Sequence, residues 1–124
     1  MSQISKLITR LEFITQQMED MISGDSPLAE KPKGYATVAV WHGPEVSRKA
    51  SEKRKAEIRF QDLATEAQAL AREAYGCLRS EGIDTYNADV EELNKSIFPN
   101  PSRAQVVRYA KVNIAALRAK SLLL

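Results

Sequence analysis

Large apolar side chains recur at intervals of three and four residues along the first part of the chain: Ile4, Leu7, Leu11, Ile14, Met18 and Met21. This spacing places them on one face of an α-helix. We therefore expect a helix over residues 3–22, ended by Gly24, because glycine readily adopts the left-handed conformation that closes helices. An isolated helix of this length is marginally stable in water, so its apolar face must pack against another element.

A second apolar pattern alternates small and large side chains: Ala56, Phe60, Leu63, Ala67, Leu70, Ala74 and Cys77. It predicts a long helix over residues 44–81, with Pro44 at its first position and Gly82 just after its end. The alternating alanines allow a second helix to approach closely. The natural antiparallel partner of this seam is the 3–22 helix.

Two shorter helices are expected over residues 87–97 and 103–121. The first has Asn87 or Asp84 as its N-terminal cap and acidic residues in its first turn, where the helix dipole favours negative charge. The second opens with a Ser-x-x-Gln capping box. Each helix carries an apolar face, formed in the first by Tyr86, Val90, Leu93 and Ile97, and in the second by Val107, Ala110, Ile114 and Leu117.

The segment between the two long helices has no helical pattern. Residues 23–34 form a polar linker with two prolines, and residues 35–41, which include Val38 and Val40, are rich in β-branched and aromatic side chains. This second stretch is either a β-strand that pairs with another subunit or a partner protein, or an extended strap over the helices. Both interpretations stay open, because no other segment has the pattern of a strand that could pair with it.

These elements together predict a mainly α fold in a single domain, residues 1–124. Its centre is an antiparallel hairpin of the two long helices, with the two shorter helices packed on it and one isolated extended strand, 35–41, pairing between subunits. The apolar faces indicate a homo-oligomer, most simply a symmetric dimer. The residues expected at the interface between copies are Ile4, Leu7, Leu11, Ile14, Met18, Val38, Val40, Phe60, Leu63 and Leu70.

Hydropathy and cysteine content indicate a cytoplasmic protein. No apolar run reaches the roughly 18 to 20 residues needed to span a bilayer, and the N-terminal residues lack the apolar block of a secretory signal. Cys77 is the one cysteine, which excludes a disulfide within the chain and fits a reducing compartment. We therefore expect no membrane partner.

Residue types suited to catalysis or metal binding are scarce. The chain has one histidine, His42, and lacks the motifs of nucleophile elbows, phosphate-binding loops and zinc proteases. The acidic trio Asp89, Glu91 and Glu92 is better explained by the dipole of the helix it begins than by magnesium binding. We therefore expect no enzyme activity, no cofactor and no metal.

The net charge of +2 conceals an uneven distribution of charged side chains. Residues 83–98 carry four acidic side chains and one basic one, whereas residues 99–124 carry five basic side chains and no acidic one. A basic stripe on the 103–121 helix, with polar groups at the start of that helix, suits phosphates or base edges. The residues of this first candidate for binding nucleic acid or another anion are Ser102, Arg103, Gln105, Arg108, Lys111 and Arg118.

A second basic patch lies at the start of the 44–81 helix and comprises Arg48, Lys49, Lys53, Arg54, Lys55 and Arg59. Three acidic residues, Glu45, Glu52 and Glu57, interrupt it at spacings that allow ion pairs along a helix. A solvated face with salt bridges is therefore the simpler interpretation, and a phosphate-binding strip is the alternative.

Two functions follow from these patterns. The first is a non-catalytic oligomeric binding protein that uses a basic helix face to engage an acidic partner, with nucleic acid and acidic proteins among the candidates. The second is an accessory or inhibitory protein that sequesters a phosphorylated small molecule, such as a nucleotide, between subunits.

The triplet Pro101-Ser102-Arg103 resembles the opening of the last helix in phage proteins that sequester cyclic nucleotides, although three residues do not assign that family. A short helical chain also suits an accessory gene of a phage or mobile element.

Overall fold

The computed structural model describes residues 3–24, 28, 44–97 and 100–124, with the backbone alone for residues 44–49 and 97. It contains the helices α1 (Gln3–Ile22), α2 (Pro44–Ser80), α3 (Ala88–Ile97) and α4 (Arg103–Ser121). The expected mainly helical fold is confirmed, and the described residues form no strand. The stretch 35–41, with Val38 and Val40, lies outside the described residues.

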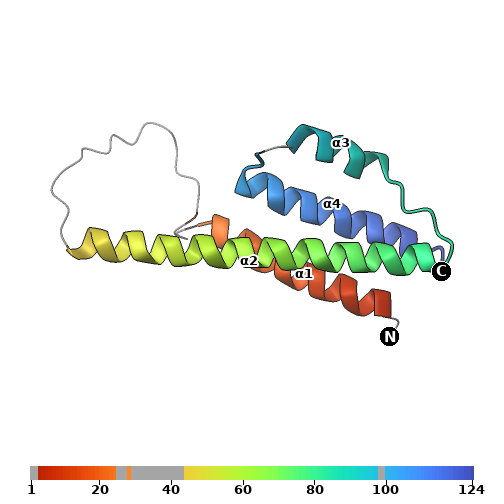
Figure 1. Ribbon diagram of the computed structural model, residues 1–124, viewed down its shortest axis with the longest axis horizontal. Helices are drawn as coiled ribbons and strands as arrows, with labels where there is room; N and C mark the ends of the chain where they lie inside the picture. The colour runs from red at the N-terminus through yellow and green to blue at the C-terminus, as the bar shows by residue number, and fades with distance from the viewer. Residues whose placement is uncertain (1–2, 25–27, 29–43, 98–99) are drawn as a thin grey trace.

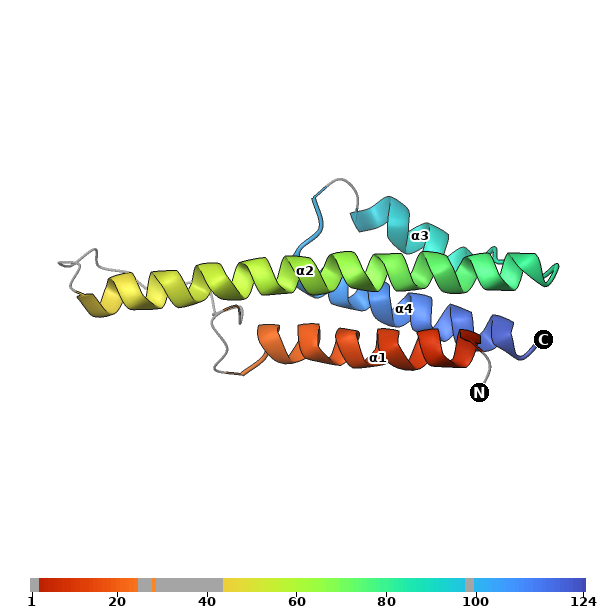
Figure 2. The ribbon, with the colours of Figure 1, turned by 60° about the horizontal axis from the view of Figure 1, so that its bottom comes forward.

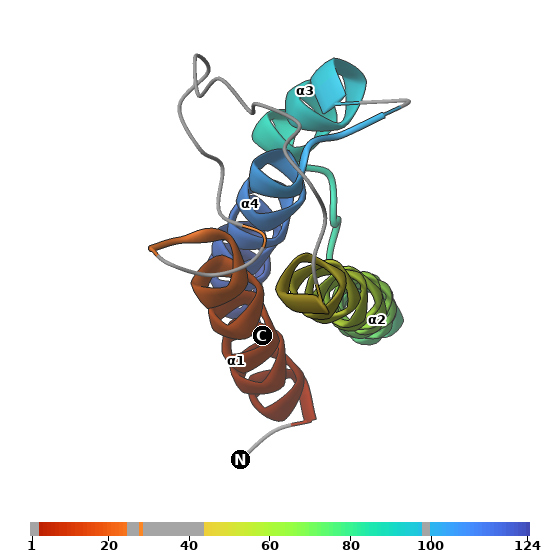
Figure 3. The same cartoon turned by 90° about the vertical axis from the view of Figure 1, so that its left-hand side faces the viewer.

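Three of the helices lie side by side (Figures 1 and 2). In these views α1 and α2 run in opposite directions, and α4 runs in the same direction as α2. The end-on view in Figure 3 places α1, α2 and α4 around a common centre, with α3 on the outer side of α4. Among the described helices α3 contacts α4 alone, so it adds a partial outer layer to a three-helix core.

The core is formed by the apolar faces of α1, α2 and α4. The five largest side chains that are almost completely buried come from all three helices: Leu11, Ile14 and Met18 from α1, Leu78 from α2 and Leu117 from α4. Burial of each contributes about 1.5–3 kcal/mol. Four of the residues that α2 buries around them are alanines: Ala64, Ala67, Ala71 and Ala74.

Most of the residues expected between copies lie in the core of the single chain. The side chains of Ile4, Leu11, Ile14, Met18, Phe60 and Leu63 are each 7% exposed or less, and Leu7 and Leu70 are half-buried against the same core. Side chains that are already buried within one chain have little area left to bury against a second copy. Association between copies stays a prediction, and Val38 and Val40, which that prediction also includes, lie outside the described residues.

The ends of the helices follow the local sequence signals. Gly82 has a φ of +78°, which closes α2 with hydrogen bonds from the Gly82 N–H to the Arg79 carbonyl (3.0 Å) and from the Ile83 N–H to the Leu78 carbonyl (3.0 Å). α2 thus ends at Ser80. Of the two possible caps for α3, Asn87 is the one used, since its Oδ1 accepts from the Val90 N–H at 3.1 Å.

Candidate functional site

Three of the five cations of α4 are paired with acids of the neighbouring helices. Lys111 Nζ lies 2.7 Å from Glu19 Oε2, and Arg118 pairs with Glu12. These two glutamates are two turns apart on α1, on the side that faces α4. The predicted basic stripe of α4 has no acidic residue within α4, but acidic residues of α1 lie beside it. Two of its cations, Lys111 and Arg118, are therefore compensated by ion pairs.

The start of α4 is also occupied by contacts within the chain. Ser102 and Gln105 form the predicted capping box: the Gln105 N–H donates to Ser102 Oγ at 3.2 Å, and the Ser102 N–H donates to Gln105 Oε1 at 2.8 Å. Arg103 lies 3.5 Å from Glu57 of α2. Of the six residues predicted for anion binding, Arg108 is therefore the one without a partner in the part of the chain that the structure describes. It lines a groove of about 610 Å³ between α3 and α4, together with Asp89 and Glu92.

The second basic patch lies on a part of α2 that extends beyond the bundle. Figures 1 and 2 show α2 continuing past the C-terminal end of α1 and the start of α4. We call residues 50–59 the α2 arm. Its side chains are exposed apart from the half-buried Ala56, and Phe60 is the first buried residue after it. Lys53, Arg54, Lys55 and Arg59 have no ion-pair partner among the described residues, while the side chains of Arg48 and Lys49 lie outside them.

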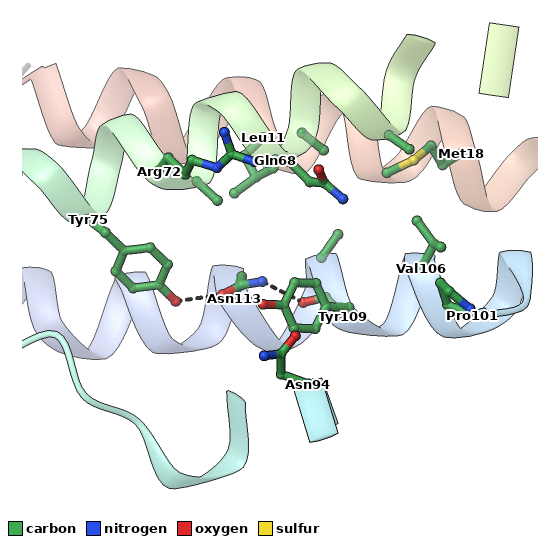
Figure 4. Close-up of a pocket in the computed structure, with 14 residues that line it drawn as sticks. Leu11, Met18, Gln68, Arg72, Tyr75, Asn94, Pro101, Val106, Tyr109 and Asn113 are labelled. Atoms are coloured by element: carbon green, nitrogen blue, oxygen red, sulfur yellow. Dashed lines mark hydrogen bonds between the residues drawn. The ribbon is translucent and has the colours of Figure 1, made fainter. Parts of the chain in front are cut away.

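A groove of about 480 Å³ lies between α2 and α4, with Asn94 of α3 at its edge (Figure 4). Leu11 and Met18 of α1 form its base. Its walls are lined by the alanines Ala64, Ala67 and Ala71 of α2 and Ala110 of α4. An alanine side chain is a single methyl group. Both α2 and α4 therefore pack on the same core, and the space between these two helices stays partly unfilled.

A short chain of hydrogen bonds closes one end of this groove. The Tyr75 hydroxyl donates to Asn113 Oδ1 at 2.7 Å, and Asn113 Nδ2 donates to the Tyr109 carbonyl at 3.1 Å. Burial, and secondarily the neighbouring Tyr109, raises the pKa of Tyr75 to about 12. Tyr75 is therefore a neutral hydrogen-bond donor at physiological pH, which suits a structural role and not that of a general base.

The rim of the groove carries polar side chains that form no hydrogen bond with another side chain of the described residues. Gln68 and Arg72 lie one turn apart on α2, Asn94 comes from α3, and all three are exposed. Arg72 has no ion-pair or hydrogen-bond partner among the described residues. Tyr109 of α4 lies beside Asn94, across the groove from Gln68 and Arg72 (Figure 4).

This rim was not predicted from the sequence, in which the alanine seam indicated a close helix contact only. The available signal lay in two polar pairs at four-residue spacing beside small residues, Gln68 with Arg72 and Tyr109 with Asn113. Polar pairs that border a run of alanines on facing helices indicate a lined groove more specifically than the alanines do alone.

The described residues also contain groups that are typical of catalytic and metal sites, but these groups do not cluster. Across the described residues, no three histidine, cysteine or acidic side chains are grouped as metal ligands. The trio Asp89, Glu91 and Glu92 is exposed on α3, and His42 lies outside the described residues. None of the helices in the described ranges is both long and apolar enough to cross a membrane.

Comparison with known proteins gives no relative: no protein-family model, no curated protein and no solved structure matches this chain. A proposal for its function therefore rests on its own residues alone.

Proposed function

We propose that this protein is a non-catalytic binding protein that engages an acidic partner through the α2 arm, and that duplex nucleic acid is the partner that fits best. The observation that supports this is the contrast between two sets of cations. Arg103, Lys111 and Arg118 each have an acid within the chain, whereas the four cations of the α2 arm have none among the described residues.

Unpaired cations are the better groups for binding a polyanion. A phosphate that approaches Lys111 has to displace Glu19 or share the lysine with it, while a phosphate that approaches Lys53 or Lys55 replaces only water and counterions. Binding to a polyanion also releases the ions condensed on that polyanion, and each neutralised phosphate adds to this gain. The cations of the α2 arm are therefore the favoured contact points.

The position of the α2 arm supports the same assignment. A helical segment without tertiary contacts is marginally stable in water, and the exposed stretch before Phe60 has little packing against the bundle. A partner that covers this segment would stabilise its helical form. Lys53, Arg54 and Lys55 are consecutive on the helix and therefore point in three different directions, which suits non-specific contacts with phosphates better than the reading of a base sequence.

The proposal is tested by the affinity of the chain for a labelled DNA duplex, measured by fluorescence anisotropy over a range of salt concentrations. The test variant replaces three cations of the α2 arm: Lys53→Gln, Arg54→Gln and Lys55→Gln. The matched control removes the same charge from α4: Arg103→Gln, Lys111→Gln and Arg118→Gln. We expect the arm variant to lose most of its affinity and its log–log salt slope to become shallower by about 2.7, since each phosphate contact contributes about 0.9.

The α4 control should retain the greater part of its affinity, because its cations are already compensated within the chain. Two results contradict the proposal. One is the absence of salt-dependent binding by the unaltered protein, and the other is an equal or larger loss of affinity in the α4 control.

A further inference from the structure

The groove between α2 and α4 has the features of a small-molecule site. Its volume of about 480 Å³ lies within the range of about 300–1,000 Å³ typical of ligand pockets. Its walls are methyl groups of alanine, and Tyr109 supplies an aromatic ring on the α4 side (Figure 4). A planar ring can lie against such methyl groups on one face and against a phenol ring on the other.

The polar groups at the rim are of two kinds: amides, which can bind a heterocyclic base, and a guanidinium, which can bind a phosphate. Gln68 and Asn94 carry amides, which both donate and accept hydrogen bonds, and this is the pattern that base edges require. Arg72 carries a guanidinium that forms no ion pair with any described residue, and guanidinium groups bind phosphates through paired hydrogen bonds. The side of the groove that carries Asn94 and Tyr109 thus suits a heterocyclic base, and the side that carries Arg72 suits an anionic group.

We propose that this groove binds a nucleoside monophosphate, with the base between the alanine wall and Tyr109, its edge toward Asn94, and the phosphate toward Arg72 and the neighbouring Gln68. The site lies within one chain, unlike the pocket between subunits that the sequence suggested. It shares no residue with the α2 arm, so it is independent of the function proposed above.

The test is an isothermal calorimetric titration of the full chain with the monophosphates of adenosine, guanosine, cytidine and uridine. We expect at least one of them to bind with a dissociation constant below about 1 mM. Arg72→Ala should raise that constant by about tenfold or more, because it removes a charge-assisted contact with the phosphate. Arg108→Ala is the matched control, since Arg108 is also an exposed arginine without a partner among the described residues and lines a different groove. It should leave the constant within about twofold of the unaltered value.

Two further measurements separate the base contact from the phosphate contact. The matching nucleoside, which lacks the phosphate, should bind the unaltered chain and Arg72→Ala equally. Ala71→Leu should abolish binding by filling the groove; Arg72→Ala carries the test if that variant does not fold, because Arg72 is exposed.

Three results would overturn the proposal: no binding by any of the four nucleotides, an equal effect of Arg108→Ala and Arg72→Ala, or binding of inorganic phosphate as tight as that of the best nucleotide. The arm variant Lys53→Gln, Arg54→Gln, Lys55→Gln should bind the nucleotide normally. Failure of DNA binding and failure of nucleotide binding are therefore distinguishable.

Discussion

The Tyr75 hydroxyl and Asn113 Oδ1 are joined by a hydrogen bond of 2.7 Å that links α2 to α4 beside the alanine-lined groove. Asn113 is 4% exposed, and its amide also donates to the Tyr109 carbonyl of its own helix. Alanine faces fit one another in several registers, whereas this bond can form in only one. The pair therefore fixes how α2 sits against α4.

This relationship predicts strong coupling between the two side chains. Asn113→Leu should lower the free energy of unfolding by about 1–3 kcal/mol, because it leaves the half-buried Tyr75 hydroxyl without its acceptor. Tyr75→Phe should cost a similar amount by leaving Asn113 Oδ1 unpaired. The double variant should cost less than the sum, since neither polar group then remains unsatisfied. Urea unfolding of the four proteins measures the coupling, and strictly additive losses would refute it.

The raised pKa of Tyr75 predicts a loss of stability at alkaline pH. The phenol ionises near pH 10 in the unfolded chain and at about 12 in the folded one. The folded chain therefore holds this proton more tightly, so the contribution is complete below about pH 10 and is lost as the pH rises toward 12. Over this window the unaltered protein should lose unfolding free energy faster than Tyr75→Phe does. Parallel pH profiles of the two proteins, measured by urea unfolding, would contradict this assignment.

The ion pairs between α1 and α4 predict a gain of binding when their acids are neutralised. Glu12→Gln with Glu19→Gln frees Arg118 and Lys111, which should increase the affinity for duplex DNA and steepen its salt slope by up to about 1.8. The loss of stability should stay below about 2 kcal/mol, because exposed ion pairs contribute about 1 kcal/mol or less each. Asp20→Gln with Glu73→Gln, which removes the same charge at exposed positions without an ion pair among the described residues, should change the slope less. Equal effects of the two double variants would show that only net charge matters.

The sequence predicted the helices well because their signals are local. Apolar spacing along α1, the glycine after α2 and the Ser102–Gln105 box each depend on residues within a few turns of one another. Local geometry decides such features before any long-range contact forms, which is why the observed ends of the helices lie close to those signals.

The candidate sites depend on residues far apart in the chain, and the sequence could not place them. The pairing of Arg118 with Glu12 joins α4 to α1, so a stripe that has no acid in its own helix is neutralised by another helix. The groove likewise needs Arg72 of α2, Asn94 of α3 and Tyr109 of α4 together. Only the packing of the helices brings these groups to one place.

Amide hydrogen exchange of the α2 arm, with and without a DNA duplex, tests the proposed binding surface most directly. Amides of residues 50–59 should exchange faster than those around Leu78 in the free protein, because the α2 arm has little tertiary packing. On addition of DNA, the α2 arm should become protected while α4 stays unchanged. Protection of α4 with an unchanged α2 arm would contradict binding through the α2 arm.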